Sequence, residues 1–155
     1  MSPELGSPET IAVAADHGGF ELKALLVQHL KDKGFDVLDL GTHSTESVDY
    51  PDIVEKLVDV IRSGRVRRGV LMCGTGIGAS IAANRHPEVR AALCHDVTTA
   101  RLSRQHNDAN VLTLGGRTTG PEIAKECLDA FLVTAFEGGR HARRVGKLGA
   151  RTPAC

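Results

Sequence analysis

Aromatic side chains are scarce in this chain of 155 residues, which has no tryptophan and an aromatic share of only 3%. Proteins that bind single-stranded nucleic acid stack bases on several such rings, so that class of partner is not expected. The formal net charge is zero with histidine neutral. The chain therefore lacks the basic excess typical of proteins that bind nucleic acid or acidic membranes. No apolar run approaches the ~20 residues of a membrane-spanning helix.

Cysteine use is equally sparse. The four cysteines stand at positions 73, 94, 127 and 155, and no two form a C-x-x-C pair. Neither a disulfide framework nor a structural zinc is expected, and a reduced, cytoplasmic setting fits best. No charged segment followed by an apolar core opens the chain, so no secretory signal is expected. Residues 1–9 predict a disordered lead and residues 149–155 a flexible tail.

Between these ends, short apolar runs alternate with segments of helical periodicity. Strands are predicted at residues 10–15, 35–40, 68–73, 89–94 and 110–114, each followed by a helix. Gly138-Gly139 is expected to end the fifth helix, and residues 140–148 to form a short basic helix. This alternation predicts an α/β fold of three layers, a Rossmann-like five-stranded parallel sheet with helices on both faces. Residues 10–148 are expected to form one domain.

Polar or titratable groups follow every predicted strand. They are Asp16-His17, Gly41-Thr42-His43, Cys73-Gly74-Thr75, His95-Asp96 and Gly115-Gly116-Arg117. Because ligands of such sheets bind beyond the carboxyl ends of the strands, this edge is the expected site of chemistry.

The segment Cys73-Gly74-Thr75-Gly76-Ile77-Gly78 joins a buried strand to a helix through a glycine-rich turn. Backbone N–H groups beside a helix N-terminus form a site for anions, and the same field favours the ionised thiolate of Cys73. A single cysteine at a strand end also fits a small buried hydrophobic residue. Residues 74–79 further match the G-x-G-x-x-G/A dinucleotide pattern, with Asp96 at about the spacing of a ribose-binding acid. That pattern normally follows the first strand of its unit, whereas here it follows the third.

Several motifs in order make the chain resemble the ribose-5-phosphate isomerase type B family, the RpiB/LacAB group of sugar-phosphate isomerases. They are Ala15-Asp16-His17-Gly18-Gly19-Phe20, Asp49-Tyr50-Pro51, the Cys73 segment, Ser103-Arg104-Gln105-His106-Asn107-Asp108, Gly115-Gly116-Arg117 and Glu137-Gly138-Gly139-Arg140-His141. The resemblance spans residues 11–148. It implies a Rossmann-like fold, a homodimer or dimer of dimers with active sites between subunits, and neither metal nor organic cofactor. It also implies isomerisation of D-ribose 5-phosphate and D-ribulose 5-phosphate, in the non-oxidative branch of the pentose phosphate pathway.

The resemblance also assigns roles to individual residues. Cys73 corresponds to the base that moves the proton between carbons, and His106 to the residue that opens the sugar ring, with Asp16 and Thr75 assisting. A further set corresponds to substrate-binding positions: His17, Tyr50, Gly74, Gly76, Ile77, Gly78, Asn107, Arg117, Arg140 and Arg144. Another branch of the family carries a glutamate base farther along the loop, but this chain has Gly78-Ala79-Ser80 there. No role falls to His141 or Arg143.

Simpler interpretations stay open beside these roles. Asp16 suits a helix cap, His106 a surface histidine near a helix C-terminus, and Tyr50 a packing aromatic. The arginines of residues 140–144 suit a solvated basic helix. A six-carbon sugar phosphate, a nucleotide-binding module and an inactive sugar-phosphate binder are the alternatives to the pentose phosphate isomerase.

Overall fold

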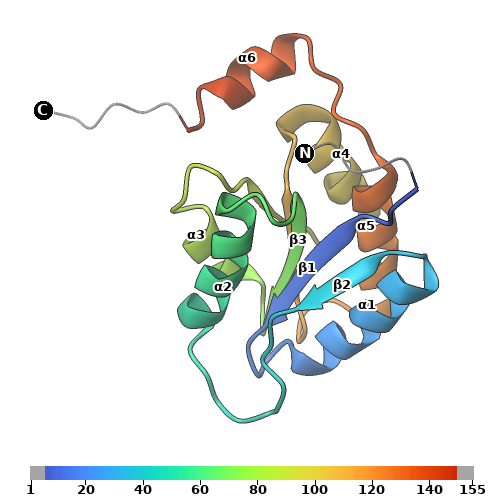
Figure 1. Cartoon of the computed structure of the whole chain (residues 1–155), viewed down its shortest axis with the longest axis vertical. Coiled ribbons are helices and arrows are strands. Elements are labelled where there is room, and N and C mark those ends of the chain that lie inside the picture. The colour runs from blue at the N-terminus through green and yellow to red at the C-terminus, as the bar shows by residue number, and fades with distance from the viewer. Residues whose placement is uncertain (1–5, 150–155) are drawn as a thin grey trace, which may run out of the picture.

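The computed structural model describes residues 6–149, and these form one five-stranded sheet flanked by helices (Figure 1). The strands are β1 (Thr10–Ala15), β2 (Asp36–Asp39), β3 (Arg68–Cys73), β4 (Ala91–Leu93) and β5 (Val111–Gly115). All pairs are parallel, in the order β2-β1-β3-β5-β4. The predicted fold class is thereby confirmed. Most of the expected lead and tail lies outside the described residues, but Glu9 forms an ion pair with Arg68 at 2.6 Å.

The helices cover the two faces of the sheet unequally. The core on one face gathers side chains of α1 (Phe20–Asp32), α4 (Val97–Asn107) and α5 (Pro121–Val133), with Phe131 and Leu26 fully buried. The other face carries α2 (Tyr50–Arg62) and α3 (Ile77–Ala83), with Leu57 and Val58 fully buried. No helix within residues 6–149 combines the length and the apolar character needed to cross a membrane.

The strand order reverses beside β1. The chain moves outward from β1 to β2 and then returns to pair β3 on the other side of β1. The loops that follow β1 and β3 therefore lead away in opposite directions, and in open α/β sheets this reversal is where ligands bind. The loops bearing Asp16 and Cys73 meet at this point.

The structure corrects the predicted bounds most at β4 and at the end of α5, and it ends the predicted basic helix at Gly146 rather than at residue 148. β4 covers only Ala91–Leu93, because the Asn110 side chain accepts the N–H of Arg90 at 2.8 Å and the Asn84 side chain accepts that of Ala91 at 2.8 Å. The second correction is at α5, which ends at Val133 rather than at the glycines. There Arg68 donates to the carbonyls of residues 131 and 132, and Arg104 to that of Thr134.

A buried lysine joins α1 to β2. The side chain of Lys23 is 3% exposed, and its Nζ lies 2.6 and 2.8 Å from the two carboxylate oxygens of Asp39. Burial acts to raise the pKa of Asp39, but hydrogen bonds from Lys23 and the Gly41 N–H, with the charges of Lys23 and His43, hold it below its ordinary value. The pair consequently stabilises the fold above the ordinary pKa of an aspartate, and this stability is lost as the pH falls through the lowered pKa.

Asp39→Asn is expected to lower the free energy of unfolding at neutral pH by about 1–3 kcal/mol, because it leaves the Lys23 ammonium buried without its counter-charge. The expected loss is smaller than for a fully buried ion pair, because the side chain of Asp39 is one-third exposed. Urea unfolding at pH 7 and pH 3 measures the effect, and the difference between the two proteins should be smaller at the lower pH. Asp36→Asn, an exposed change in the same strand, is the control. Equal loss from both variants at pH 7 would show that the pair contributes nothing specific.

Candidate active site

Three loops at the carboxyl edge of the sheet are tied together through their backbones. The Asp16 N–H donates to the Met72 carbonyl at 3.2 Å, which joins the β1 loop to β3. The Gly116 and Arg117 N–H groups each donate at 2.8 Å, to the carbonyls of Cys73 and Gly74 respectively. The β1 and β3 loops also touch, since a Cβ at Gly18 would lie 2.9 Å from the Gly74 nitrogen. These three of the five loops predicted to carry chemistry therefore form one hydrogen-bonded group.

Cys73 is the last residue of β3 and belongs to this group. Its side chain is 5% exposed, and the Gly76 N–H donates to its Sγ at 3.1 Å. Gly76 has φ +77°, and a Cβ there would lie 2.9 Å from the backbone of Leu114, so the turn requires glycine. The turn therefore places a backbone donor directly on the Cys73 sulfur.

The other two cysteines placed by the structure are in different surroundings. Burial raises the pKa of the Cys94 thiol. Burial, with nearby Cys94, Asp96 and Glu126, raises that of Cys127 to about 11. Both therefore stay neutral thiols at physiological pH. Neither of them lies in the glycine-rich segment of residues 73–78.

Asp16 and His17 are held by the backbone around them. The Asp16 Oδ1 accepts the N–H groups of Gly18 at 2.9 Å and Gly19 at 3.3 Å, so it braces the loop, while the α1 N-cap is Gly19 without a side-chain bond. The His17 Nδ1 accepts the Val48 N–H at 3.2 Å. Because Nδ1 accepts this bond, the ring nitrogen that can donate to an anion is Nε2. No feature of the sequence pointed to Val48, because this residue acts through its backbone N–H.

Tyr50 and Arg117 lie over the glycine loop from two sides. A Cβ at Gly78 would lie 2.6 Å from the Tyr50 Cζ, and one at Gly74 would lie 3.2 Å from the Arg117 Nη1. Tyr50 also lines a pocket of about 440 Å³ with Asp16, His17 and residues 47–49. The Thr75 hydroxyl accepts the Ile77 N–H at 3.2 Å, and the first N–H groups of α3 beyond it have no acceptor within their own helix. These donors suit an oxyanion or a phosphate.

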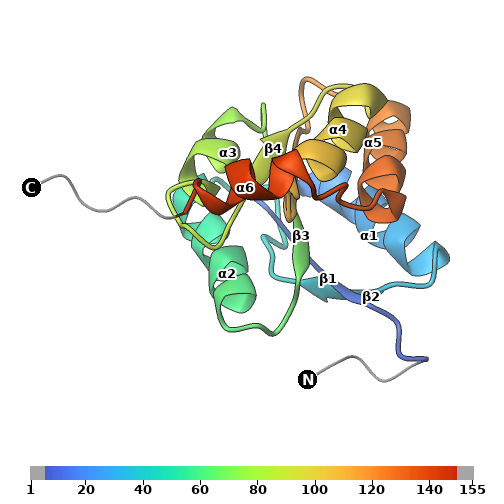
Figure 2. The ribbon, with the colours of Figure 1, turned by 90° about the horizontal axis from the view of Figure 1, so that it is seen from above.

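The remaining predicted residues form a second group at the opposite edge of the sheet. His106 and Asn107 end α4, which runs back from the carboxyl edge, and Arg140 and Arg144 lie on α6 (Arg140–Gly146). Figure 1 shows α6 at the far end of the sheet from the tips of β1, β2 and β3, and Figure 2 looks onto that end. β3 alone spans roughly 17 Å at about 3.3 Å per residue, and its interior residues are fully packed. One chain therefore does not bring His106, Arg140 and Arg144 to Cys73.

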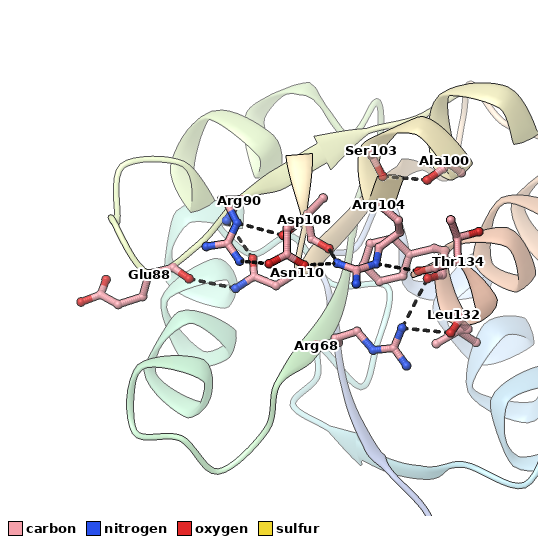
Figure 3. A network of polar contacts seen from close by, with 12 residues as sticks. Arg68, Glu88, Arg90, Ala100, Ser103, Arg104, Asp108, Asn110, Leu132 and Thr134 are labelled. Atoms are coloured by element: carbon pink, nitrogen blue, oxygen red, sulfur yellow. Dashed lines mark hydrogen bonds and ion pairs between the residues drawn. The ribbon is translucent and has the colours of Figure 1, made fainter. Parts of the chain in front are cut away.

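A polar network fixes the end of α4 that carries His106 and Asn107 (Figure 3). Asp108 adopts φ +46°, and Arg104 and Arg90 bind its carboxylate at 2.8 and 3.5 Å. Arg90 also donates to the Asp108 carbonyl at 2.8 Å, and Arg104 to that of Ala109 at 2.6 Å. The motif pointed to His106, but the supporting role of Arg90, outside every motif, had no signal in the sequence.

The chain matches known proteins over most of its length. A family model described as Ribose/Galactose Isomerase matches residues 11–148. This chain belongs to the ribose/galactose isomerase family. It is 48% identical over 135 residues to ribose-5-phosphate isomerase B of Escherichia coli, covering 87% of this chain and 91% of that one. It is 43% identical over 141 residues to D-erythrulose-4-phosphate isomerase of Pectobacterium atrosepticum, covering 90% and 93%. The structure of Clostridium thermocellum ribose-5-phosphate isomerase B matches with a TM-score of 0.89 and 50% identity, over 90% of this chain and 95% of that one.

Membership of the ribose/galactose isomerase family makes this protein an aldose–ketose isomerase and removes the support for a dinucleotide site. Asp96, which the glycine pattern offered as a ribose-binding acid, caps α4 instead, with its Oδ1 accepting the Thr99 N–H at 2.7 Å. The glycine loop follows β3 and opens a helix of seven residues. In this isomerase the glycine spacing that resembles the dinucleotide pattern is explained by the tight turn around Cys73.

Proposed function

We propose that this protein interconverts D-ribose 5-phosphate and D-ribulose 5-phosphate through an enediolate. The observation that carries the proposal is Cys73, held under a backbone N–H donor at the meeting of the β1, β3 and β5 loops. The names of the Escherichia coli and Clostridium relatives support the pentose phosphate as substrate.

The reaction needs two kinds of proton transfer. D-Ribose 5-phosphate is mostly a closed ring, so the C1–O4 bond first breaks as O4 gains a proton and the C1 hydroxyl loses one. His106 performs this exchange, with Asp16 and Thr75 hydrogen-bonding the hydroxyls. The Cys73 thiolate then takes the proton from C2, and the electron pair moves onto O1 to give the enediolate. The N–H groups of the glycine loop stabilise that oxygen. The proton then returns to C1 while the O2 hydroxyl loses its proton and O1 gains one, which gives the ketose with its carbonyl at C2.

We further propose that two copies of the chain complete each site. The packed sheet separates Cys73 from His106 within one chain, so a sugar phosphate that contacts both must lie between chains. Each group also adjoins exposed apolar side chains: Ile77 and Ile81, one turn apart on α3, are each 52% exposed. Asn107 in the second group lines a pocket of about 630 Å³ that also includes Val145 and Leu148. Such surfaces favour burial against another protein chain.

In this arrangement the phosphate is held from both sides. His17 and Arg117 come from the carboxyl edge of one copy, and Arg140 and Arg144 from α6 of the other. Arg140 and Arg144 are four residues apart, so they project from one face of α6. A forked guanidinium from each suits the phosphate oxygens.

Arg140→Ala is expected to raise KM about tenfold or more with little change in kcat, because the phosphate is bound equally in the ground and transition states. Steady-state kinetics with D-ribose 5-phosphate measures the split. Arg143→Ala, an exposed change on the same helix, is the matched control. A fall in kcat at unchanged KM would place Arg140 in the chemistry rather than in phosphate binding.

The substrate itself is tested by measuring turnover of D-ribose 5-phosphate and of six-carbon aldose 6-phosphates such as those of allose and galactose, with a metal chelator present. The proposal expects the pentose to have the highest kcat/KM and the chelator to have no effect. Higher kcat/KM for a hexose phosphate would assign the protein to the six-carbon branch, and no turnover of any would contradict an active isomerase. The cytoplasmic setting stays a prediction, consistent with the free thiols of Cys73, Cys94 and Cys127.

A further inference from the structure

A second histidine lies directly against His106. The ring of His141, in the first turn of α6, stacks on the ring of His106 with 4.4 Å between centroids and 11° between planes. His141 is 7% exposed, whereas His106 is half-buried. The mechanism above uses His106 and leaves His141 without a role.

The two histidines and Glu137 have the composition of a metal site, with ligand atoms within 4.8 Å of one another. The stack argues against that use. A metal bound to imidazole nitrogen lies close to the plane of the ring, about 2.0–2.1 Å from the nitrogen. Two nearly parallel rings, one above the other, share no such point unless one of them turns. The geometry fits a ring that supports another ring.

We propose that His141 is a positioning residue that sets the ring plane of His106 for opening the sugar ring, an inference that rests on the proposed function. A histidine ring turns broadly about its χ2 angle, so its neighbours must impose its orientation. The face of His141 supplies that constraint on one side of His106.

His141 can do this because its own place is fixed relative to α4. The Glu137 N–H donates to the Gln105 carbonyl at 3.1 Å, which ties the segment before α6 to the residue next to His106. The His141 N–H donates to the Gly138 carbonyl at 3.0 Å, and this bond closes the turn that carries the ring. The network around Asp108 fixes the backbone at the end of α4 that carries His106. The backbone segments that carry the two rings are therefore tied together.

The charge on His141 also suits this role. Burial lowers the pKa of His141, and the neighbouring Arg140, His106 and Arg144 lower it further, against an opposing effect of Glu137, whose Oε2 lies 3.7 Å from the His141 Nε2. His141 is thus neutral at physiological pH. A neutral ring lets His106 gain and release a proton without a fixed like charge against its face.

The direction of the reaction separates positioning from mere folding. Ring opening is needed only from the aldose side, because D-ribulose 5-phosphate has its O5 esterified and cannot close a five-membered ring on C2. In the reverse direction the open aldehyde can leave and close in solution. His141→Ala should therefore lower kcat for D-ribose 5-phosphate about tenfold, within the range of acid–base catalysis, while kcat and KM for D-ribulose 5-phosphate stay within about twofold of wild type.

Two further variants complete the test. His141→Phe keeps a flat ring against His106 and should restore the forward rate, and Arg143→Ala should change neither direction. Equal loss in both directions would mean that His141 only holds α6 and its arginines in place, and would overturn the inference, as would an unchanged forward rate or failure of His141→Phe to restore it. If the wild-type protein converts neither sugar, the proposed function fails instead, so the two failures are distinguishable.

Discussion

Cys73→Ala is expected to lower kcat/KM for D-ribose 5-phosphate by about 10³-fold or more, the range for loss of a positioned general base, with no loss of fold. The side chain is small and its sulfur accepts one hydrogen bond, from the Gly76 N–H. Alanine fits the same turn but cannot accept a proton from carbon. No carboxylate or histidine lies among residues 74–80 to replace it. Both reaction directions should fall together, because the proton transfer at carbon is common to them.

Exchange of the C2 hydrogen of the substrate with deuterium from D₂O, followed by NMR, tests the role of Cys73 without relying on net turnover. Cys73→Ala should abolish the exchange and Cys94→Ala should retain it, since the Cys94 thiol is buried elsewhere and its pKa is raised. Thermal unfolding of both variants verifies that each is folded. Exchange in Cys73→Ala near the wild-type rate would mean that another group is the base.

The carboxyl-edge half of the site could be predicted from the sequence because parallel strands end at a common edge. Asp16, Cys73 and Arg117 each follow an apolar run, and the structure ties their loops together by backbone hydrogen bonds. The glycine spacing correctly predicted the tight turn at Gly76. The nucleotide alternative failed at Asp96, where a short-range capping bond, rather than a distant ligand, explains the acid.

The other half of the site could be recognised in the sequence, but its position in the fold could not be predicted. The motif around His106 assigns a role to this residue by resemblance. It contains no information about the edge of the sheet at which His106 lies. The helix α4 carries His106 back across the sheet, and α6 keeps Arg140 beside it. The contact of His141 with His106 could not be predicted either, because the stacking of two rings from different helices has no characteristic spacing in the sequence. The end of α5 was mispredicted because Arg68 and Arg104, distant in sequence, bind its last carbonyls.

The central claim is that one site is built from Cys73 of one copy and His106 of another. Cys73→Ala and His106→Ala chains can be co-expressed with two different affinity tags and purified through both. Each mixed dimer then contains one site with both residues intact and one with neither. By symmetry the mixed dimer should regain about half of the wild-type rate with D-ribose 5-phosphate, although each parent dimer is nearly inactive.

That measurement, the forward rate of the doubly purified assembly beside its two parents, tests the account most directly. Recovery to about half the wild-type rate is the predicted result. A mixed assembly no faster than its parents, or a chain that stays monomeric and fully active, would contradict a site shared between copies.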